Sequence, residues 1–405
     1  MLSRVWLAAI LVLAACGSTD PRLAEPLPEL HPKNPEDLVQ LLVDVGVTND
    51  IIRFGILADL SGPSAQADTA LVDAQKVYWA AVNAGGGVGG RQVEVMVIDT
   101  AADVDRHVAG YDQLVFDSSG LGSEVLALAH SSGVATTLAI ADLANRDQLM
   151  VVTNTQLSRW ADNPVVFAPG ASYCTEAINA VSWLDNTVRG ATGTPLRLAV
   201  VGDGSPASID AVAGAREVIS ELGLELVLEL DVGSAGGTAA RAAPAALAAA
   251  NPNGVFAAVG DSSLDELFAA SRDLGMEATW LGNAHTIASS AFAEADFGLG
   301  DSSDGLALMQ WFFVATSAIP ANADAVARAE AELLHAALER AVSNGDLRRE
   351  GLVQAFDVAE APPLLDTTIY GLVIAPIGPD NETRAQLTAV SGPEPWPTAL
   401  VRSCS

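Results

Sequence analysis

The chain has 405 residues, half of them apolar and only 5% aromatic, and a formal net charge of −30. At this length two hydrophobic cores are more usual than one, and an apolar content dominated by Ala, Val and Leu favours helices packed on parallel strands. So acidic a surface repels phosphate groups, which argues against nucleic-acid binding and against electrostatic docking on anionic lipids.

The N-terminus has the features of a lipoprotein signal. Arg4 precedes an apolar run from Val5 to Leu13, which is far shorter than the ~20 residues that span a bilayer but is typical of a secretory signal. Leu13-Ala14-Ala15-Cys16 then resembles a bacterial lipobox, in which the thiol is acylated and the preceding peptide is removed. We therefore expect residues 1–15 to be a signal peptide and Cys16 to hold an extracytoplasmic protein at the membrane through lipid alone. A plain secretory signal with a chance cysteine is the alternative.

Residues 16–50 are predicted to form a tether. Five prolines between residues 17 and 50 favour extended chain, with one short helix around Asp37 to Val45. Acylation of Cys16 leaves Cys174 and Cys404 as an even pair in an oxidising compartment, so we expect a disulfide between them. Two buried free thiols are the alternative, because sequence alone does not bring the two side chains together.

From Ile51 onward, short apolar runs alternate with longer amphipathic stretches, which predicts buried strands alternating with helices. Right-handed crossovers then place the strands of one run in a parallel sheet with helices on both faces. The first run has predicted strands over 52–58, 92–98, 125–129 and 149–152 and helices over 68–83, 103–116 and 134–146. The second, after Pro169, has strands over 196–201, 224–230, 254–259 and 279–281 and helices over 209–222, 238–250 and 264–274.

The repeated plan predicts an α/β protein of two doubly wound, Rossmann-like lobes. A third block returns to complete them, with helices over 323–342 and 347–356 and a strand over 368–374, and the chain after Gly378 is expected to run over the surface. We assign residues 51–169 and 284–360 to the first lobe and residues 170–283 and 361–405 to the second.

Ligands of open parallel sheets bind beyond the carboxyl ends of the strands, where loops and helix N-termini present unpaired N–H groups. Two lobes that face each other would form a cleft lined by such loops. The expected loops are 60–67, which carries Ser64 and Gln66, and 130–133, 153–156, 203–208, 260–263 and 283–286.

Three segments near the start of the first run form a specific pattern when they occur in this order. Ile52 to Pro63 is a strand that ends in Ala-Asp-Leu-Ser-Gly-Pro, Asn83 to Arg91 is a glycine-rich turn, and Val93 to Thr100 is a second strand that ends in Asp-Thr. Together they resemble the branched-chain amino acid binding family, which are type I periplasmic solute-binding proteins of ABC transporters. The resemblance continues, more weakly, to about Leu281, and Asn344-Gly345-Asp346-Leu347 again resembles a late helix connection of the family.

The resemblance implies a bilobed receptor with three crossings between its lobes, which closes around a small solute such as an amino acid, an amide or a related carboxylate. In that family the ligand's carboxylate is held by a serine on the loop corresponding to Ser131-Ser132-Gly133 and by groups on the loop corresponding to Thr153-Asn154-Thr155. The partial positive charge and free N–H groups of a helix N-terminus agree with an anion there. Simple capping of the next helix is the alternative role of Ser131 and Ser132.

Two loops depart from the family's pattern. The segment from Gly202 to Ser208 lacks the aromatic residue that the family commonly has, and the acidic residue for the ligand's amine would fall near Asn283, which is not ionisable. Asp203 and Asp261 are the candidates to replace it, although each could equally be a solvated carboxylate. The expected ligand-binding residues are Ser64, Gln66, Ser131, Ser132, Thr153, Asn154, Thr155, Asp203, Asp261, Ser262 and Asn283.

Two motifs resemble those of proteins with other chemistries. Gly85, Gly87 and Gly90 have G-x-G-x-x-G spacing, but the loop follows a helix and precedes a strand, the reverse of a dinucleotide site, so we expect these glycines to turn the chain. Ala129-His130-Ser131-Ser132-Gly133 is one residue from the nucleophile elbow of serine hydrolases, which would need a base such as His285 and an acid such as Asp304 or Asp366.

The five histidines, His31, His107, His130, His285 and His335, lack the paired spacing of zinc sites. We expect them at the surface or in loops, and we expect no metal, no cofactor and no catalytic residue. The expected partners are a small-molecule solute and an ABC permease, with no nucleic acid, and the protein is expected to be a monomer. A non-transport sensor or scaffold on the same fold is the first alternative, and a serine hydrolase using Ser131 is a remote one.

Overall fold

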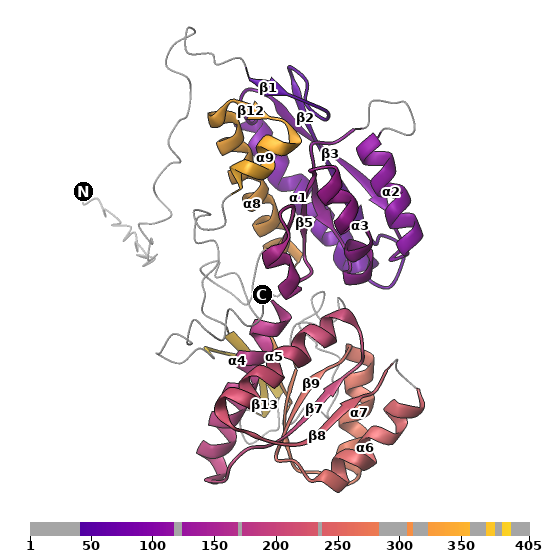
Figure 1. Ribbon diagram of the computed structural model, residues 1–405, viewed down its shortest axis with the longest axis vertical. Coiled ribbons are helices and arrows are strands. Elements are labelled where there is room, and N and C mark those ends of the chain that lie inside the picture. The colour runs from indigo at the N-terminus through magenta and orange to yellow at the C-terminus, as the bar shows by residue number, and fades with distance from the viewer. Residues whose placement is uncertain are drawn as a thin grey trace, which may run out of the picture. The chain divides into compact units, whose positions relative to one another are not determined.

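The computed structural model describes residues 41–116, 124–168, 172–233, 237–282, 306–310, 323–356, 370–376 and 383–389 (Figure 1). Every described element belongs to the unit that runs from Leu41 to Ser405. The lipobox, the prolines of the tether, Asn283, His285 and Cys404 lie outside the described residues.

A parallel sheet forms the first lobe. Among the described residues it has the strand order β3-β2-β4-β5-β6, and every neighbouring pair is parallel. Its strands are β2 (Ile51–Ala58), β3 (Gln92–Asp99), β4 (Ala127–Ser131), β5 (Met150–Thr153) and β6 (Val166–Phe167). The helices that contact these strands or one another are α1 (Ala65–Ala84), α2 (Val104–Phe116), α3 (Val134–Arg146), α8 (Ala323–Asn344) and α9 (Arg349–Ala355).

A larger sheet forms the second lobe, with the described strand order β14-β13-β11-β10-β9-β7-β8. The run from β11 to β8 is parallel, and β13 and β14 are antiparallel at one edge. Its strands are β7 (Arg197–Gly202), β8 (Glu225–Asp231), β9 (Gly254–Ala258), β10 (Thr279–Gly282), β11 (Leu306–Gln310), β13 (Tyr370–Pro376) and β14 (Thr383–Ala389). The helices are α4 (Tyr173–Thr192), α5 (Pro206–Leu222), α6 (Thr238–Ala250) and α7 (Asp261–Asp273).

The chain passes between the two sheets three times, after β6, after β11 and after α9. A short 3-10 helix, η3 (Ser158–Asp162), lies before β6, and a small two-stranded sheet pairs β1 (Leu42–Val43) with β12 (Asp346–Leu347). Figure 1 shows α8 and α9, late in the chain, beside the strands of the first sheet. The predicted α/β fold of two doubly wound lobes is confirmed.

Three local expectations were wrong, and one helix was missed. Residues 306–310, assigned to the first lobe, form β11 and pair with β10 of the second sheet. The chain after Gly378 adds β14 to that sheet by antiparallel pairing with β13. Residues 42–43 are a strand paired to β12, so no helix reaches Val45. The 20-residue helix α4 was not predicted at all.

The glycine-rich turn between α1 and β3 behaves as expected. Gly86, Gly87, Gly89 and Gly90 all have positive φ. At Gly87 a side chain is excluded, because its Cβ would lie 1.9 Å from the carbonyl oxygen of Arg91. The turn therefore reverses the chain and leaves no cradle for a phosphate.

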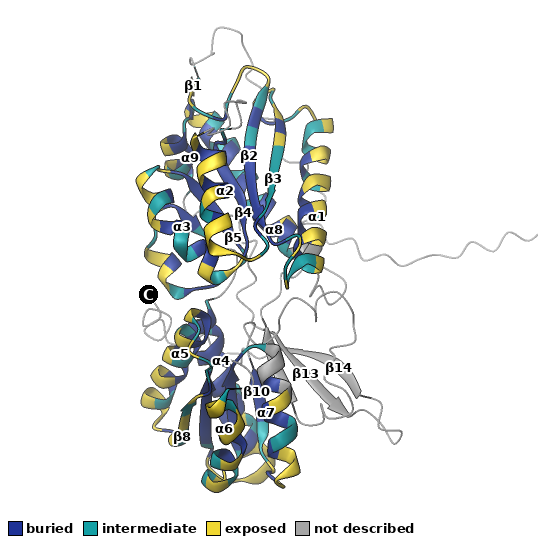
Figure 2. Cartoon of the chain, turned by 90° about the vertical axis from the view of Figure 1, so that its right-hand side faces the viewer, coloured by how far each residue is buried: buried dark blue, intermediate teal, exposed yellow. Residues whose placement is uncertain are grey.

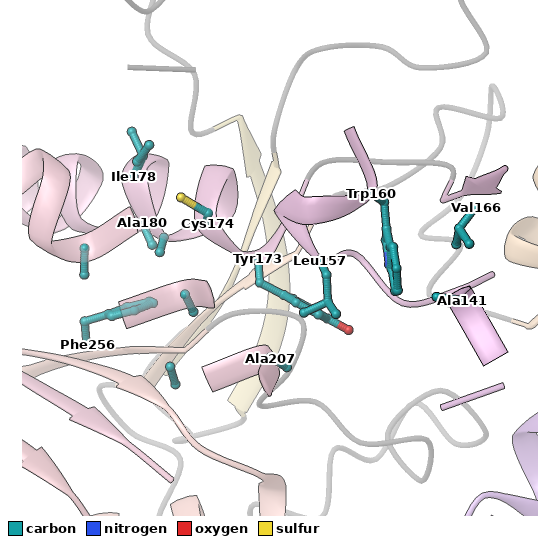
Figure 3. Packing of buried hydrophobic residues seen from close by; sticks show 14 of the residues in the cluster. Ala141, Leu157, Trp160, Val166, Tyr173, Cys174, Ile178, Ala180, Ala207 and Phe256 are labelled. Carbon is teal, nitrogen blue, oxygen red and sulfur yellow. The ribbon is translucent and has the colours of Figure 1, made fainter. Parts of the chain in front are cut away.

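Three clusters of buried side chains stabilise the sheets. The central strands β4, β5 and β9 are buried throughout, and the outer faces of the helices are exposed (Figure 2). One cluster contains strands of both sheets, because Leu57 and Val151 of the first belong to it with Val200 and Phe256 of the second. Figure 3 shows the part of this cluster where Leu157, Tyr173 and Ala207 lie close together. The second and third clusters belong to the first and second sheets respectively.

A buried polar contact fixes the returning helix α8 to the first sheet. Nδ1 of His130, on β4, lies 3.0 Å from both carboxylate oxygens of Glu330 on α8, and both side chains are fully buried. Nε2 of Gln75, on α1, donates a 3.1 Å hydrogen bond to the same carboxylate. Burial alone would lower the pKa of His130, but the charge of Glu330 and the hydrogen bond to it raise this pKa above its ordinary value.

Glu330→Ala should lower the free energy of unfolding by about 3 kcal/mol, because it leaves the buried imidazole and the Gln75 amide without their acceptor. Urea unfolding at pH 7 measures the change. The matched control is Glu332→Ala on the same helix, which removes an exposed pair with Arg328 and should cost less than about 1 kcal/mol. Equal losses in the two variants would contradict this role of Glu330.

Candidate functional site

The carboxyl ends of β2, β4 and β5 lie side by side at one edge of the first sheet. Leu57 pairs in register with Ser131, and Ser131 pairs with Thr153. The loops that follow these strands therefore begin next to one another, as the sequence predicts for a ligand site. Of the expected residues, Ser64, Ser131, Ser132, Thr153, Asn154 and Thr155 lie on these loops or strand ends, and Gln66 is exposed in the first turn of α1.

The hydroxyl groups of Ser131 and Thr153 are used inside the protein. Ser131 Oγ lies 3.0 Å from Nε2 of His107, on α2, and 2.8 Å from Oγ1 of Thr137, on α3. Thr153 Oγ1 donates to the carbonyl oxygen of Ser131 at 2.8 Å and lies 3.0 Å from Oγ1 of Thr155. Ser131, Thr153, His107 and Thr137 are all completely buried. The side chain of Ser131 is therefore a support for the two loops, and a ligand has no access to it.

Other groups at this edge remain available to a ligand. Ser132, which is 7% exposed, and the half-buried Asn154 have side chains that make no hydrogen bond within the described part of the chain. The N-cap of α3 is Gly133, with φ of +85°, and no side chain caps the helix. Its first-turn N–H groups therefore keep the partial positive charge of a helix N-terminus. Gly133 is required here, since a Cβ would lie 2.6 Å from Oγ1 of Thr136.

Aspartate side chains hold the loops after β2 and β3 in place by accepting their backbone N–H groups. The carboxylate of Asp59 accepts the backbone N–H groups of Gly62 and Ser64, and Asp68 accepts the N–H of Asp59. Oδ1 of Asp99 accepts the N–H of Leu60 and of Ala101, each at 2.9 Å. A hydrogen bond from the Ser61 hydroxyl, together with these N–H groups and Arg106, lowers the pKa of Asp99 against the effect of burial. The carboxylate is therefore ionised at neutral pH.

The loops of the second sheet show the same use of aspartate. Asp203, after β7, accepts the N–H of Ser205 at 2.9 Å and the N–H of Gly260, after β9, at 3.0 Å. It thus holds two loops together, a role that the sequence did not predict for it. Ser205 caps α5 by accepting the N–H of Ser208. Asp261 and Ser262 lie in the first turn of α7, whose N-cap Gly260 provides no side chain.

The loop after β5 is joined to the second lobe through Asp210 of α5. Oδ2 of Asp210 accepts the N–H of Ser158 and the N–H of Cys174, both at 3.1 Å, and its other oxygen accepts the Ser158 hydroxyl. Burial raises the pKa of Asp210, although these three hydrogen bonds favour its charged form. Cys174 is disulfide-bonded. Its pairing with Cys404 stays a prediction.

The residues that lie behind the loops were not predicted from the sequence. His107 and His130 were expected at the surface or in loops, and both are completely buried. His107 has a recognisable signal, since Gly110, Tyr111 and Leu114 are buried on the same helix at spacings of three, four and seven residues. No comparable signal marks Asp210, because its donors are 52 and 36 residues away in the chain.

The pairing of Ser131 with His107 does not form a hydrolase site. The predicted base and acids are outside the described residues, namely His285, Asp304 and Asp366. The histidine that lies within hydrogen-bond distance of the Ser131 hydroxyl is His107. Its Nδ1 has no hydrogen-bond partner in the described part of the chain, so no acid orients the ring. Burial, with the neighbouring charge of His130, lowers the pKa of His107 to about 4. The serine and the histidine are both enclosed, and an ester could not reach them.

The described ranges bring no three metal-ligating side chains together. Within the same ranges, none of the helices combines the length and the hydropathy that a membrane span requires.

Two doubly wound sheets with three crossings and helix N-termini at their strand tips define the fold of the type I periplasmic binding proteins. A family model described as "Periplasmic binding protein" matches residues 51–359, and the chain belongs to this family. It is therefore a solute-binding protein of extracytoplasmic type. No curated protein is significantly similar to it in sequence.

Solved structures agree on the fold. A fatty acid ABC transporter substrate-binding protein from Thermomonospora curvata is 21% identical, with 89% of this chain and 96% of that chain covered and a TM-score of 0.70. A branched-chain amino acid ABC transporter protein from Thermus thermophilus with bound valine is 17% identical, with coverage of 88% and 99% and a TM-score of 0.65. A solute-binding protein from Rhodopseudomonas palustris BisB5 in complex with 3,4-dihydroxybenzoic acid is 17% identical, with coverage of 84% and 97% and a TM-score of 0.65.

Acid should destabilise the protein through His107. Its folded pKa of about 4 lies below the ordinary value near 6.5, so the unfolded chain takes up a proton first as the pH falls. The stability that the neutral ring contributes is complete above about pH 6.5 and falls by about 3 kcal/mol as the pH drops towards 4. Urea unfolding of the native protein and of His107→Gln between pH 7 and 4.5 tests this. The variant should lose less stability on acidification, and parallel curves would contradict the assignment.

Proposed function

We propose that this protein is the substrate-binding component of an ABC transporter, which captures a small solute such as an amino acid, an amide or a related carboxylate and delivers it to the permease. The solute is held by non-covalent contacts alone, and the protein acts as a monomer. The observation that carries the proposal is the group of unpaired donors at β4 and β5. It consists of the uncapped N-terminus of α3, the Ser132 hydroxyl and the Asn154 amide.

The chemistry of these donors favours a carboxylate or carbonyl oxygen. Hydroxyl, amide and backbone N–H groups donate to such oxygens, and the dipole of a 13-residue helix adds partial positive charge. The solutes named for the similar structures are a fatty acid, valine and 3,4-dihydroxybenzoic acid. Each carries one carboxyl group, which supports the same class of solute here.

Ser132→Ala and Asn154→Ala should each weaken solute binding by about three- to tenfold, the value of one hydrogen bond of about 1 kcal/mol. Neither change should alter the thermal midpoint of the unliganded protein appreciably, because neither side chain bonds within the described protein. A thermal-shift screen with valine, 3,4-dihydroxybenzoate and octanoate as first probes identifies a solute that binds. Calorimetry then measures the affinity of the native protein and of each variant for that solute.

Ser131→Ala is the matched control for this experiment. It should lower the free energy of unfolding by about 1–3 kcal/mol, because the buried side chains of His107 and Thr137 lose a hydrogen-bond partner. The proposal fails if solute affinity is insensitive to Ser132 and Asn154.

We further propose that the protein is secreted across the cytoplasmic membrane and that Cys16 carries the lipid that anchors it in the periplasm or at the cell surface. The apolar run, the small residues and the cysteine support this assignment together. The proline-containing segment of residues 16–50 would act as a spacer between the lipid and the lobes.

Cys16→Ser should move the protein expressed in a bacterial host from the detergent phase to the aqueous phase in a detergent-partition assay. Cys404→Ser is the control, since it removes a thiol without touching the lipobox, and it should stay in the detergent phase. Retention of the Cys16 variant in detergent would exclude this anchor.

A further inference from the structure

We propose that Asp210 is a positioning residue that fixes the segment after β5, in the first lobe, to helix α5 of the second lobe and so sets the orientation of the two lobes. Where it concerns the solute, the inference rests on the proposed function, because both segments adjoin loops of the proposed site. Asp210 acts through the segments that it joins and makes no contact with the solute itself.

The carboxylate of Asp210 accepts hydrogen bonds from both lobes. Its Oδ2 accepts the backbone N–H of Ser158, in the first lobe, and the N–H of Cys174, in the second, each at 3.1 Å. Its Oδ1 accepts the hydroxyl of Ser158. No lysine or arginine pairs with this carboxylate within the described part of the chain. Its two oxygen atoms therefore serve three donors, two of which belong to Ser158.

The bond to Cys174 stays within the second lobe and fixes the position of Asp210 there. Helices α4 and α5 pack closely, since Gly214 of α5 lies against the backbone of Cys174 and a Cβ on it would be 2.2 Å from the carbonyl oxygen. Asp210 and Cys174 therefore move together as parts of one lobe. A change in the orientation of the lobes has to be taken up by the two bonds to Ser158.

Apolar side chains enclose this junction. Leu157, Tyr173 and Ala207 adjoin the three bonded segments, and all three side chains are buried in the cluster that both sheets share (Figure 3). The N–H of Tyr173 also donates to the carbonyl oxygen of Gln156 at 2.7 Å, a second hydrogen bond between the lobes. Hydrogen bonds to a charged acceptor are strengthened where water is kept away. The junction is therefore a firm point of attachment between the lobes.

The bonded segments lead directly to the proposed solute site. Ser158 begins η3, and Nε1 of Trp160 in this helix donates to the carbonyl oxygen of Thr155 at 3.0 Å, beside the donor Asn154. In the second lobe, Asp210 lies in the second turn of the helix that follows loop 203–208. Through these connections, Asp210 determines how a loop of each lobe lies with respect to the other.

The charge of Asp210 does not stabilise the fold. Burial raises its pKa above the ordinary value, so at neutral pH the folded protein bears a cost for the ionised group that the unfolded chain does not. Asp210→Asn avoids this cost and can keep the geometry. The amide oxygen accepts the two N–H groups, and the amide nitrogen donates to Oγ of Ser158. The neutral variant therefore separates the positioning role from a role in stability.

The first measurement is the distance between the lobes in the unliganded protein. Dyes are attached through unnatural amino acids at Ala80 on α1 and Ala245 on α6, which are both exposed, and energy transfer is recorded on single molecules. Asp210→Ala leaves three donors without their acceptor and should broaden the distribution of distances. Asp210→Asn should keep the native distribution, with a urea midpoint no lower than that of the native protein. Glu217→Ala removes an exposed acid from the same helix and is the matched control, which should change nothing.

The second measurement is the affinity for the solute found in the thermal-shift screen. Asp210→Ala should weaken binding by about tenfold, because only a fraction of the molecules then holds the two loops in the binding orientation. Asp210→Asn should restore the affinity to within about threefold of the native value. Should Asp210→Ala fail to fold, Ser158→Ala takes its place. It removes one donor of the first lobe, and should broaden the distances and weaken binding by about threefold.

The outcomes separate this inference from the proposed function. An unchanged distribution of distances in Asp210→Ala, or in Ser158→Ala where it takes that place, would overturn the role of Asp210 whatever the affinities are. Equal broadening in Asp210→Asn and Asp210→Ala would overturn it too, because the asparagine keeps the hydrogen bonds. A screen in which no solute binds would count against the receptor function, while the distances in the unliganded protein still decide the role of Asp210.

Discussion

Backbone donors at the carboxyl edge of a parallel sheet are the constraint on which this structure depends. Most of the parallel strands, such as β2, β3, β4, β7, β8 and β9, are followed by an α-helix. The first-turn N–H groups of such a helix have no partner within the helix, and the sheet places several such ends along one edge. A buried N–H without an acceptor is costly, so side chains must be provided for them. The chain provides carboxylates at β2, β3, β7 and β8, whereas β4 and β5 end in hydroxyls that bond to one another. Further along the segment after β5, Asp210 accepts the N–H of Ser158. In the proposed site, the donors left without acceptors at these two strand tips are the groups that would bind the solute.

Buried polar side chains lie behind the hydroxyl groups at the ends of β4 and β5. Two of them are histidines, His107 and His130, whose pKa values are shifted in opposite directions. His130 is paired with Glu330, which raises its pKa, whereas burial and the nearby His130 lower the pKa of His107. Two rings whose pKa values are shifted in opposite directions therefore lie behind the same loop. One has a carboxylate as its partner and the other has the Ser131 hydroxyl. Because Glu330 comes from α8, the loop is complete only after the chain has returned from the second lobe. The long-range crossing is thus a requirement of the site as well as of the fold.

The predicted elements and the observed ones differ where neighbours in space replace neighbours in sequence. Helix α3 and helix α6 were predicted with the observed bounds, since apolar periodicity and flanking turns are local signals. Helix α4 was missed, because Glu176, Asn179, Ser182 and Asp185 are buried polar residues on it and obscure the apolar stripe. The site followed the same rule. The predicted ends of the strands gave the positions of its loops. Which of Ser131 and Ser132 is available to a ligand depends on the contacts of Ser131 with His107 and Thr137, and no sequence pattern predicts those contacts.

Neutral donors also suit a receptor that must give its solute away. An arginine fork binds a carboxylate through charged hydrogen bonds worth about 1.5–3 kcal/mol each, roughly twice the value of neutral ones. A site built from N–H, hydroxyl and amide groups binds its anion more weakly within one lobe, so the remaining affinity has to come from contacts that form only when both lobes engage the solute. Release then requires only that the lobes part, because no strong ion pair must be broken. In the proposed site, the use of neutral donors therefore makes capture of the solute depend on the conformation of the lobes, which a permease can control.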